Sequence, residues 1–331
     1  MVIFSKEYPA RRAVALWILC LTFTATFSLI LPAAFGTEID SYSSFRHDRF
    51  ASGGYGGGAV LNANAFFSEY DFSGVGRAGS SPITMITPIH GLAAAHFAPS
   101  GQVTFVNRSG NLVTRTVVAT DPILDSSVNS TTDLLFVTLD SELGATDEVA
   151  TYSLTYPTGR SPMSGDLNAI DHAELLVYGK QHAVGRNELD GVEYSALGNK
   201  NFSYLAMGAS VGVAGIFDYA PSTGFSPDEA KLVSGDSGHP TFLTNNNDLI
   251  LFGLHLAIGT FDGVQFNFDT FAPFYWPELS ARIDDYNNAQ GTSYALALTD
   301  VTVSVPEPDS LPLFCLGGLL VVLGGYRRRF L

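Results

Sequence analysis

Basic residues, cysteines and charged side chains are all scarce in this sequence of 331 residues. It holds 17 Lys and Arg against 32 Asp and Glu, a formal net charge of −15, with 15% charged residues. So acidic a chain lacks the basic face that phosphates require, and we expect no nucleic-acid partner. Two cysteines allow one disulfide at most, which excludes a disulfide scaffold. A content of 46% hydrophobic and 12% aromatic residues excludes disorder, and the length suits one large or two ordinary domains.

Spacings that hold metals or phosphates are also missing. The seven histidines are scattered, with no His-Glu-x-x-His and no cysteine pair, so we predict no metal and no cofactor. The segment 37–71 is polar and then rich in glycine over residues 53–58, yet neither Lys-Ser/Thr nor a helix follows. This pattern indicates a flexible N-terminal linker rather than a phosphate-binding loop.

The first 36 residues predict an export signal. Three basic residues precede the uncharged apolar run Ala13 to Leu31, and Ala34-Phe35-Gly36 offers small residues for cleavage before Thr37. The alternative is an uncleaved membrane anchor, because a helix of this length would just span the bilayer core of about 30 Å.

The last residues form an ordered triple of motifs. Pro306-Glu307-Pro308 is followed by the apolar run Leu311 to Tyr326 and then by Arg327-Arg328-Arg329, as expected of a short membrane segment with a cytoplasmic basic cluster. Residues 305–331 closely resemble the PEP-CTERM sorting signal. The resemblance implies an exported protein of the cell envelope, cell surface or extracellular matrix of a Gram-negative bacterium. It also implies an exosortase as processing partner, and membrane contact only through the terminal segments. A plain C-terminal tail anchor is the alternative.

Setting the two ends aside changes the composition of the remaining domain. Between residues 37 and 305 there are 29 acidic and 11 basic residues, a net charge of −18. Cys20 and Cys315 both lie in the terminal signals, so we expect a folded domain without any disulfide.

The sequence predicts many short strands in the middle of the chain. Apolar runs of four to eight residues, rich in Val, Thr and aromatics, alternate with Gly, Pro, Asn, Asp and Ser, which favours an antiparallel sandwich or barrel pair. One helix is indicated near Pro277, where Leu279, Ile283 and Tyr286 follow a helical spacing. The predicted strands include Ile83–Thr87, Val103–Val106, Val113–Ala119, Leu134–Leu139, Leu175–Tyr178 and Leu249–Leu256.

Three short segments carry candidate chemistry. Gly235-Asp236-Ser237-Gly238 places a serine on a glycine-flanked loop, where the amides of Gly235 and Ser237 can face a developing oxyanion. A serine needs a base, and His96 follows a run of small residues at the end of an apolar strand. Asp133 opens another such strand and can orient a histidine. Taken singly, each segment could also be a turn or a structural residue.

Together, the order His96, Asp133, Ser237 resembles that of the trypsin-like (chymotrypsin-fold) serine proteases. Ala94-Ala95-His96, Asp133–Phe136 and Gly235–Pro240 match the family's three motif blocks, within residues 72–290. The resemblance implies two antiparallel six-stranded β-barrels with the active site between them and a C-terminal helix at 277–287. It implies His96 as general base, Asp133 as its orienter, Ser237 as nucleophile and Asp236 as the acid shaping the loop.

Several positions depart from the family pattern. His239 replaces a glycine, Phe97 replaces a cysteine, and no activation sequence precedes His96. An N-terminal amine paired with Asp236 is therefore unsupported by the sequence. Asp140 is a weaker alternative for the triad acid and His90 for the base.

Two residues bear on specificity. Lys231 lies six residues before Ser237, where the family places the floor of the primary pocket, so no acid there selects basic residues. His255 stands where glutamyl endopeptidases carry a histidine facing an acidic side chain. The resemblance thus suggests a protein or peptide substrate with Glu or Asp before the cleaved bond.

Two functions follow. The first is an exported serine-type endopeptidase that works through an acyl-enzyme, with residues 291–304 linking its domain to the sorting signal. The second is a catalytically inactive trypsin-fold protein that binds partners or surface matrix. Retention of all three candidate triad residues favours the enzyme.

Overall fold

The computed structural model describes residues 37–125, 130–155, 170, 173–189, 202–207, 210–219, 227–261 and 264–299. The predicted export signal and the predicted sorting signal lie outside these ranges. Within them, no helix is both long enough and apolar enough to cross a membrane.

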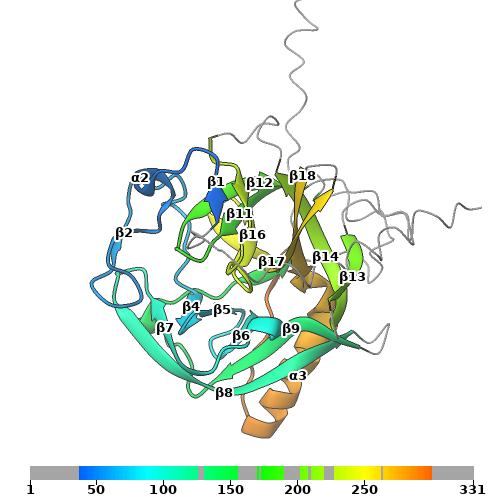
Figure 1. The fold of residues 1–331 in the computed structure, drawn as a ribbon. Coiled ribbons are helices and arrows are strands. Elements are labelled where there is room, and N and C mark those ends of the chain that lie inside the picture. Colours follow the sequence, from blue (N-terminus) through cyan, green and yellow to red (C-terminus); the bar gives the residue numbers. More distant parts are fainter. Residues whose placement is uncertain are drawn as a thin grey trace, which may run out of the picture. The chain divides into compact units, whose positions relative to one another are not determined.

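Six antiparallel strands close into a barrel in the first half of the domain (Figure 1). Their order around the barrel is β4-β5-β6-β9-β8-β7. The interior is filled by buried apolar side chains such as Ile83, Met85, Val103 and Phe105. The strands are β4 (Val75–Ala78), β5 (Ser81–Met85), β6 (His90–Ala94), β7 (Gly101–Val106), β8 (Leu112–Asp125) and β9 (Ser130–Leu139).

Small residues in β6 follow from how closely β5 and β9 flank it. A Cβ on Gly91 would lie 2.6 Å from the Cγ2 of Ile83, too near for any larger side chain. The whole strand is buried. The run of small residues before His96 is therefore a packing requirement of the barrel wall.

The second half of the domain is an open nine-stranded sheet within the described residues. Its main path runs β12-β11-β16-β17-β18-β14-β13, with β10 and β19 off that path. These strands are β10 (Ser153–Thr155), β11 (Glu174–Tyr178), β12 (Val184–Glu188), β13 (Phe202–Met207), β14 (Ser210–Tyr219), β16 (Pro240–Asn245), β17 (Asp248–Phe261), β18 (Val264–Phe271) and β19 (Leu298–Thr299). The all-β prediction is confirmed, and the architecture is consistent with a chymotrypsin-like two-barrel fold. The second half forms its part of this fold as a half-barrel sheet, in which nine strands are described.

A shared apolar core joins the two halves. It combines Phe72 and Leu92 from the first half with Tyr178 and Phe242 from the second. Separate apolar clusters fill the first barrel and the second sheet. Apolar packing thus joins the halves, and polar contacts such as that between Arg77 and His182 add to it.

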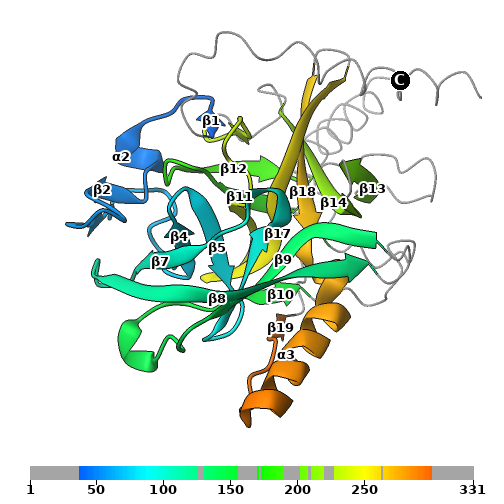
Figure 2. The ribbon, with the colours of Figure 1, turned by 60° about the horizontal axis from the view of Figure 1, so that its bottom comes forward.

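The C-terminal helix α3 (Trp276–Gln290) confirms the helix indicated near Pro277 (Figure 2). Pro277 occupies its first turn, and Leu279 and Ile283 are buried in the shared core. It ends at Gly291, whose φ of 69° suits glycine, and whose amide donates to the Asn287 carbonyl. A short 3₁₀ turn, η4 (Ala272–Tyr275), leads into the helix.

Two segments that the sequence indicated as linkers are folded into the domain. Residues 37–71 form β1 (Glu38–Ile39), α2 (Ser44–His47), β2 (Phe50–Ser52) and β3 (Val60–Leu61). The glycines of residues 53–58 form the turn between β2 and β3, and a Cβ on Gly53 would meet backbone atoms at 2.1 Å. Within 291–304, β19 pairs with β10. The first segment buries apolar side chains such as Ile39 and Phe67, and the second packs partly buried ones such as Leu296 against the shared core.

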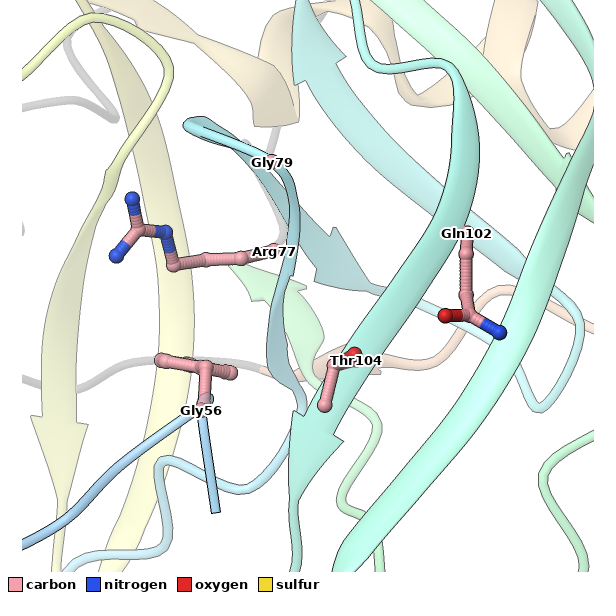
Figure 3. A pocket seen from close by; sticks show the side chains of 6 residues that line it. Gly56, Arg77, Gly79, Gln102 and Thr104 are labelled. Atoms are coloured by element: carbon pink, nitrogen blue, oxygen red, sulfur yellow. The ribbon is translucent and has the colours of Figure 1, made fainter.

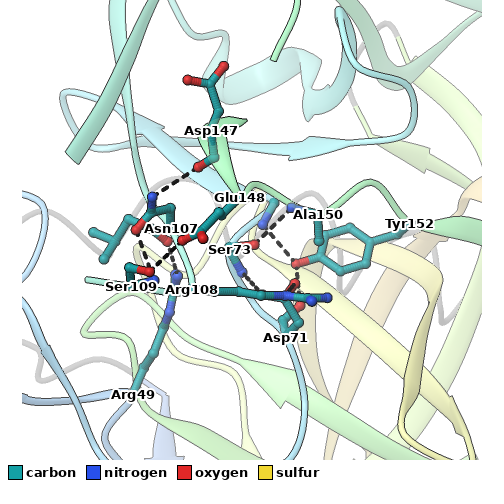
Figure 4. A network of polar contacts seen from close by, with 12 residues as sticks. Arg49, Asp71, Ser73, Asn107, Arg108, Ser109, Asp147, Glu148, Ala150 and Tyr152 are labelled. Atoms are coloured by element: carbon teal, nitrogen blue, oxygen red, sulfur yellow. Dashed lines mark hydrogen bonds and ion pairs between the residues drawn. The ribbon is translucent and has the colours of Figure 1, made fainter. Parts of the chain in front are cut away.

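Polar contacts fasten the connection between the two halves to the first barrel (Figure 4). The Tyr152 hydroxyl donates to the Asp71 carbonyl at 2.9 Å and accepts from the Gly74 amide at 3.1 Å. The Ala150 amide donates to the Ser73 hydroxyl. These contacts fix the course of the chain as it leaves the first barrel, next to the 3₁₀ turn η2 (Ala145–Asp147).

Stability should fall at acidic pH because of His90. Burial lowers the pKa of its imidazole from 6.5 to about 4, and the ring packs against Phe136, Tyr286 and Tyr294. Between these pH values the unfolded chain binds a proton that the folded chain refuses, so stability is full above pH 6.5 and decreases towards pH 4. The loss should reach about 2–3 kcal/mol. Urea unfolding from pH 7 to 4 should show a shallower pH dependence for His90→Leu; an unchanged slope would contradict this assignment.

Candidate active site

His96 and Asp133 meet at one end of the first barrel. β6 and β9 are paired with Ala94 opposite Leu134, so the turn η1 (Ala95–Phe97) brings His96 next to Asp133. His96 Nδ1 lies 2.6 Å from Asp133 Oδ2, and the His96 amide donates to Oδ1 at 2.8 Å. One carboxylate therefore holds both the backbone and the ring of the histidine.

The exposure of the two side chains differs. The Asp133 side chain is 5% exposed and the His96 side chain 41% exposed. Because the buried carboxylate accepts from Nδ1, the lone pair of Nε2 is left for another group. Nε2 has no partner among the residues that the structure describes. The ring can thus act as a base towards whatever approaches from the open side.

Ser237 lies on the loop between β15 (Ala230–Lys231) and β16. The carboxylate of Asp236 shapes this loop: it accepts from the amides of Val233 at 2.8 Å, Lys180 at 2.9 Å and Thr37 at 3.3 Å. Asp236 is 1% exposed. Gly235 and Gly238 have φ values of 99° and 75°, which L side chains rarely adopt.

The amides of Gly235 and Ser237 are free of partners among the described residues, whereas the neighbouring amides are used. Asp236 donates to the Val233 carbonyl and Gly238 to the His255 carbonyl. Two unpaired donors flanking the serine suit an anionic oxygen.

Packing places the serine loop beside the His96 turn. A Cβ on Gly238 would lie 3.2 Å from the Cβ of Ala94 and 3.3 Å from the Cγ of Pro82. Gly238 follows Ser237, and Ala94 precedes His96 by two residues. The structure thus brings the three predicted segments together from both halves of the domain.

The two alternative residues lie elsewhere. His90 is fully buried, and its Nδ1 lies 2.9 Å from the Thr87 hydroxyl. Asp140 is exposed and accepts from the Thr116 amide. Neither contacts His96 or Asp133.

The two predicted specificity residues have partners within the protein. His255 is 1% exposed, with Nδ1 2.8 Å from Asp269 Oδ1 and Nε2 3.0 Å from the Tyr178 carbonyl. Burial lowers its pKa, but Asp269 outweighs burial and the net pKa is raised. Lys231 Nζ pairs with Glu38 at 2.8 Å. Each side chain is thus engaged within the protein, His255 by groups of the nine-stranded sheet and Lys231 by Glu38 on β1. The suggested acidic preference before the cleaved bond therefore lacks its anchor.

Thr37 contacts the Ser237 loop from outside it, and no motif of the sequence indicated this contact. β1 pairs with β15 and carries Thr37 to Asp236. In this structure the Thr37 nitrogen is a peptide amide, so the contact does not test the pairing of an N-terminal amine with Asp236. Cleavage at the predicted site would make the Thr37 nitrogen a free amine.

No family model matches the chain, and no curated protein matches its sequence. A comparison with solved structures finds similarity to the NS6 protease from murine norovirus 1. The two are 13% identical, with a TM-score of 0.35 over 60% of this chain and 89% of that one. This similarity concerns the fold alone and adds no argument about the site. Among the described residues, no group of His, Cys, Asp or Glu is arranged to hold a metal ion.

Proposed function

We propose that this chain is a serine endopeptidase that hydrolyses peptide bonds through an acyl-enzyme. Ser237 is the nucleophile, His96 the general base and Asp133 the group that orients His96. The observation that carries the proposal is the Asp133 carboxylate, which holds the ring and the amide of His96 at 2.6 and 2.8 Å beside the Ser237 loop.

The reaction follows from these positions. Ser237 Oγ attacks the substrate carbonyl while His96 Nε2 takes the hydroxyl proton, and Asp133 stabilises the imidazolium that forms. The amides of Gly235 and Ser237 donate to the oxyanion, an interaction worth about 3–4 kcal/mol for one donor. His96 then returns the proton to the leaving amine, and water releases the acyl group by the same route.

Labelling with a fluorophosphonate tests this proposal directly. The wild-type domain should form one covalent adduct, whereas Ser237→Ala and His96→Ala should form none. Ser234→Ala serves as the matched control, since Ser234 is an exposed serine on the same loop. Wild-type protein that stays unlabelled although folded would instead favour the inactive, partner-binding function.

The proposal includes export to the cell envelope, cell surface or extracellular matrix, with an exosortase-type enzyme handling the C-terminal signal. It rests on the motifs of residues 1–36 and 305–331. N-terminal sequencing of the protein recovered from the envelope should give Thr37, and retention of the apolar segment 13–31 would favour the uncleaved anchor.

A further inference from the structure

Basic side chains without an acidic partner gather beside the Ser237 loop. Nine Lys and Arg residues lie in the described part of the chain, and five of them form ion pairs with carboxylates. Within the described residues, the other four form none: Arg49, Arg77, Lys180 and Arg282. Acidic residues outnumber basic ones 29 to 11 in this domain. Three basic side chains without an acidic partner in one region, Arg49, Arg77 and Lys180, are therefore unexpected.

Arg77 lines a pocket of about 400 Å³ on the first barrel (Figure 3). The other described lining residues are Tyr55, Gly56, Gly79, Gln102 and Thr104, and none of them carries a carboxylate. The buried Nε of Arg77 has no hydrogen-bond partner in the part of the chain that the structure describes. Its Nη1 lies 3.4 Å from His182 Nε2, and its guanidinium carbon lies 5.9 Å from the centre of the Tyr55 ring.

Arg49 bonds one of the residues that line the pocket, Tyr55. This arginine is 5% exposed and donates to the hydroxyls of Tyr55 at 3.0 Å and Tyr178 at 3.3 Å. Burial lowers the pKa of His182 to about 3, helped by the charges of Arg77 and Arg49. The histidine beside Arg77 is therefore neutral at ordinary pH, and the two guanidinium groups carry the positive charge.

Lys180 extends this basic region to the serine loop. Its Nζ and side-chain carbons lie 2.8–3.4 Å from the position that a Cβ on Gly235 would occupy, so the Lys180 side chain lies beside the loop at Gly235. Lys180 precedes His182 by two residues, and His182 contacts Arg77. On the other side, Arg77 is paired across the β4–β5 hairpin with Pro82, whose Cγ would lie 3.3 Å from a Cβ on Gly238.

We propose that the Arg77 pocket, together with the Lys180 ammonium, binds a carboxylate of the peptide substrate a few residues from the bond that Ser237 attacks. The proposal rests on the proposed endopeptidase function and adds a specificity site to it. Arg77 lies one strand spacing, about 4.8 Å, from Pro82 at the side of the serine loop, a distance that an extended peptide covers in about two residues. The carboxylate belongs to a Glu or Asp side chain or to the C-terminus of the peptide.

Cleavage of matched peptides tests this site. Starting from a well-cleaved peptide, Glu and Gln are compared at each of the four positions on either side of the cut, with free and amidated C-termini. We expect Glu, or a free C-terminus, to raise kcat/KM about tenfold at one position. The ratio of kcat/KM for the acidic peptide to kcat/KM for its neutral counterpart should fall to about twofold or less in Arg77→Gln. Arg77→Lys should keep part of this ratio, and added salt should lower it. Lys180→Met should lower it in part.

Arg282→Gln is the control, since it removes an equal charge from α3. It should leave the ratio unchanged, and an equal fall in this variant would show a mere effect of net charge and overturn the site. The absence of any Glu or C-terminal preference in the wild type would overturn it as well.

Binding to Ser237→Ala separates this proposal from the endopeptidase function. Fluorescence anisotropy should show tighter binding of the acidic peptide than of its Gln or amidated counterpart, and Arg77→Gln should abolish the difference. If the wild type is not labelled by fluorophosphonate but this difference is present, the endopeptidase proposal fails and the carboxylate site stands. Equal binding of the matched peptides would reject the site.

Discussion

Replacing Asp133 by asparagine is expected to lower kcat/KM by about 10⁴-fold. The carboxylate accepts from both His96 Nδ1 and the His96 amide. An asparagine can satisfy one of these donors with its oxygen, but its NH₂ group would face the other. If that group is Nδ1, the ring takes the tautomer with a hydrogen on Nε2, which cannot accept the Ser237 proton. Steady-state kinetics on a peptide substrate measure the loss.

Asp140→Asn is the matched control for this substitution, because Asp140 lies just beyond the same strand and is exposed. It should keep kcat/KM within about twofold. The double variant Asp133→Asn with Ser237→Ala should lose no more than Ser237→Ala alone, since residues that act as a unit are not additive. An Asp133→Asn enzyme with nearly full activity would show that this pair does not serve catalysis.

Replacing Asp236 by asparagine is expected to destabilise the domain by about 2–4 kcal/mol and to slow fluorophosphonate labelling by about 10²-fold or more. Three backbone amides donate to this buried carboxylate, and an NH₂ group in its place leaves at least one without an acceptor. The loop would then lose the conformation that turns the amides of Gly235 and Ser237 outward. Urea unfolding and labelling rates give the two effects.

Asp228→Asn separates a local effect from general destabilisation. Asp228 is also buried and is bound by Arg46 and His47. It should lower the free energy of unfolding to a similar degree while leaving the labelling rate of the folded protein within about threefold. Equal slowing in both variants would mean that Asp236 has no special part in the site.

The contact between Thr37 and Asp236 makes the reactivity of Ser237 depend on the residue at which the protein begins. In a protein that begins at Thr37, the nitrogen 3.3 Å from Asp236 Oδ1 is an ammonium rather than an amide, and its hydrogen bond is stronger. Fluorophosphonate should label Ser237 faster in such a protein than in one that carries Gly-Ser before Thr37. The advantage should disappear as the pH rises above about 8, where an α-amine ordinarily loses its proton.

Local motifs predicted much of the site. The order His96, Asp133, Ser237 could be predicted because each residue lies in a short sequence block. Glycines in or near these blocks allow close backbone packing, as Gly91 and Gly238 show. The helix at α3 was readable because its apolar spacing and first-turn proline are local features. These properties depend on residues only a few positions apart.

Side-chain partners across the fold were not predictable. His255 suggested a substrate-facing group, but Asp269 on the neighbouring strand and the Tyr178 carbonyl hold both of its ring nitrogens. Lys231 was assigned to a pocket floor, but Glu38 lies opposite it in the β1–β15 pair. Strand register decides which distant groups meet, and no local pattern encodes it.

By itself, the sequence determined an acidic composition and predicted an all-β domain with His96, Asp133 and Ser237 in the order of the family that it resembles. Only the tertiary structure decided that the glycine-rich start belongs to the domain, that Thr37 reaches Asp236, and that Lys180 lies beside the serine loop with no acidic partner among the described residues. The reason is physical: composition and short motifs act over a few residues, whereas charge pairing and burial depend on contacts between segments that lie far apart in the sequence.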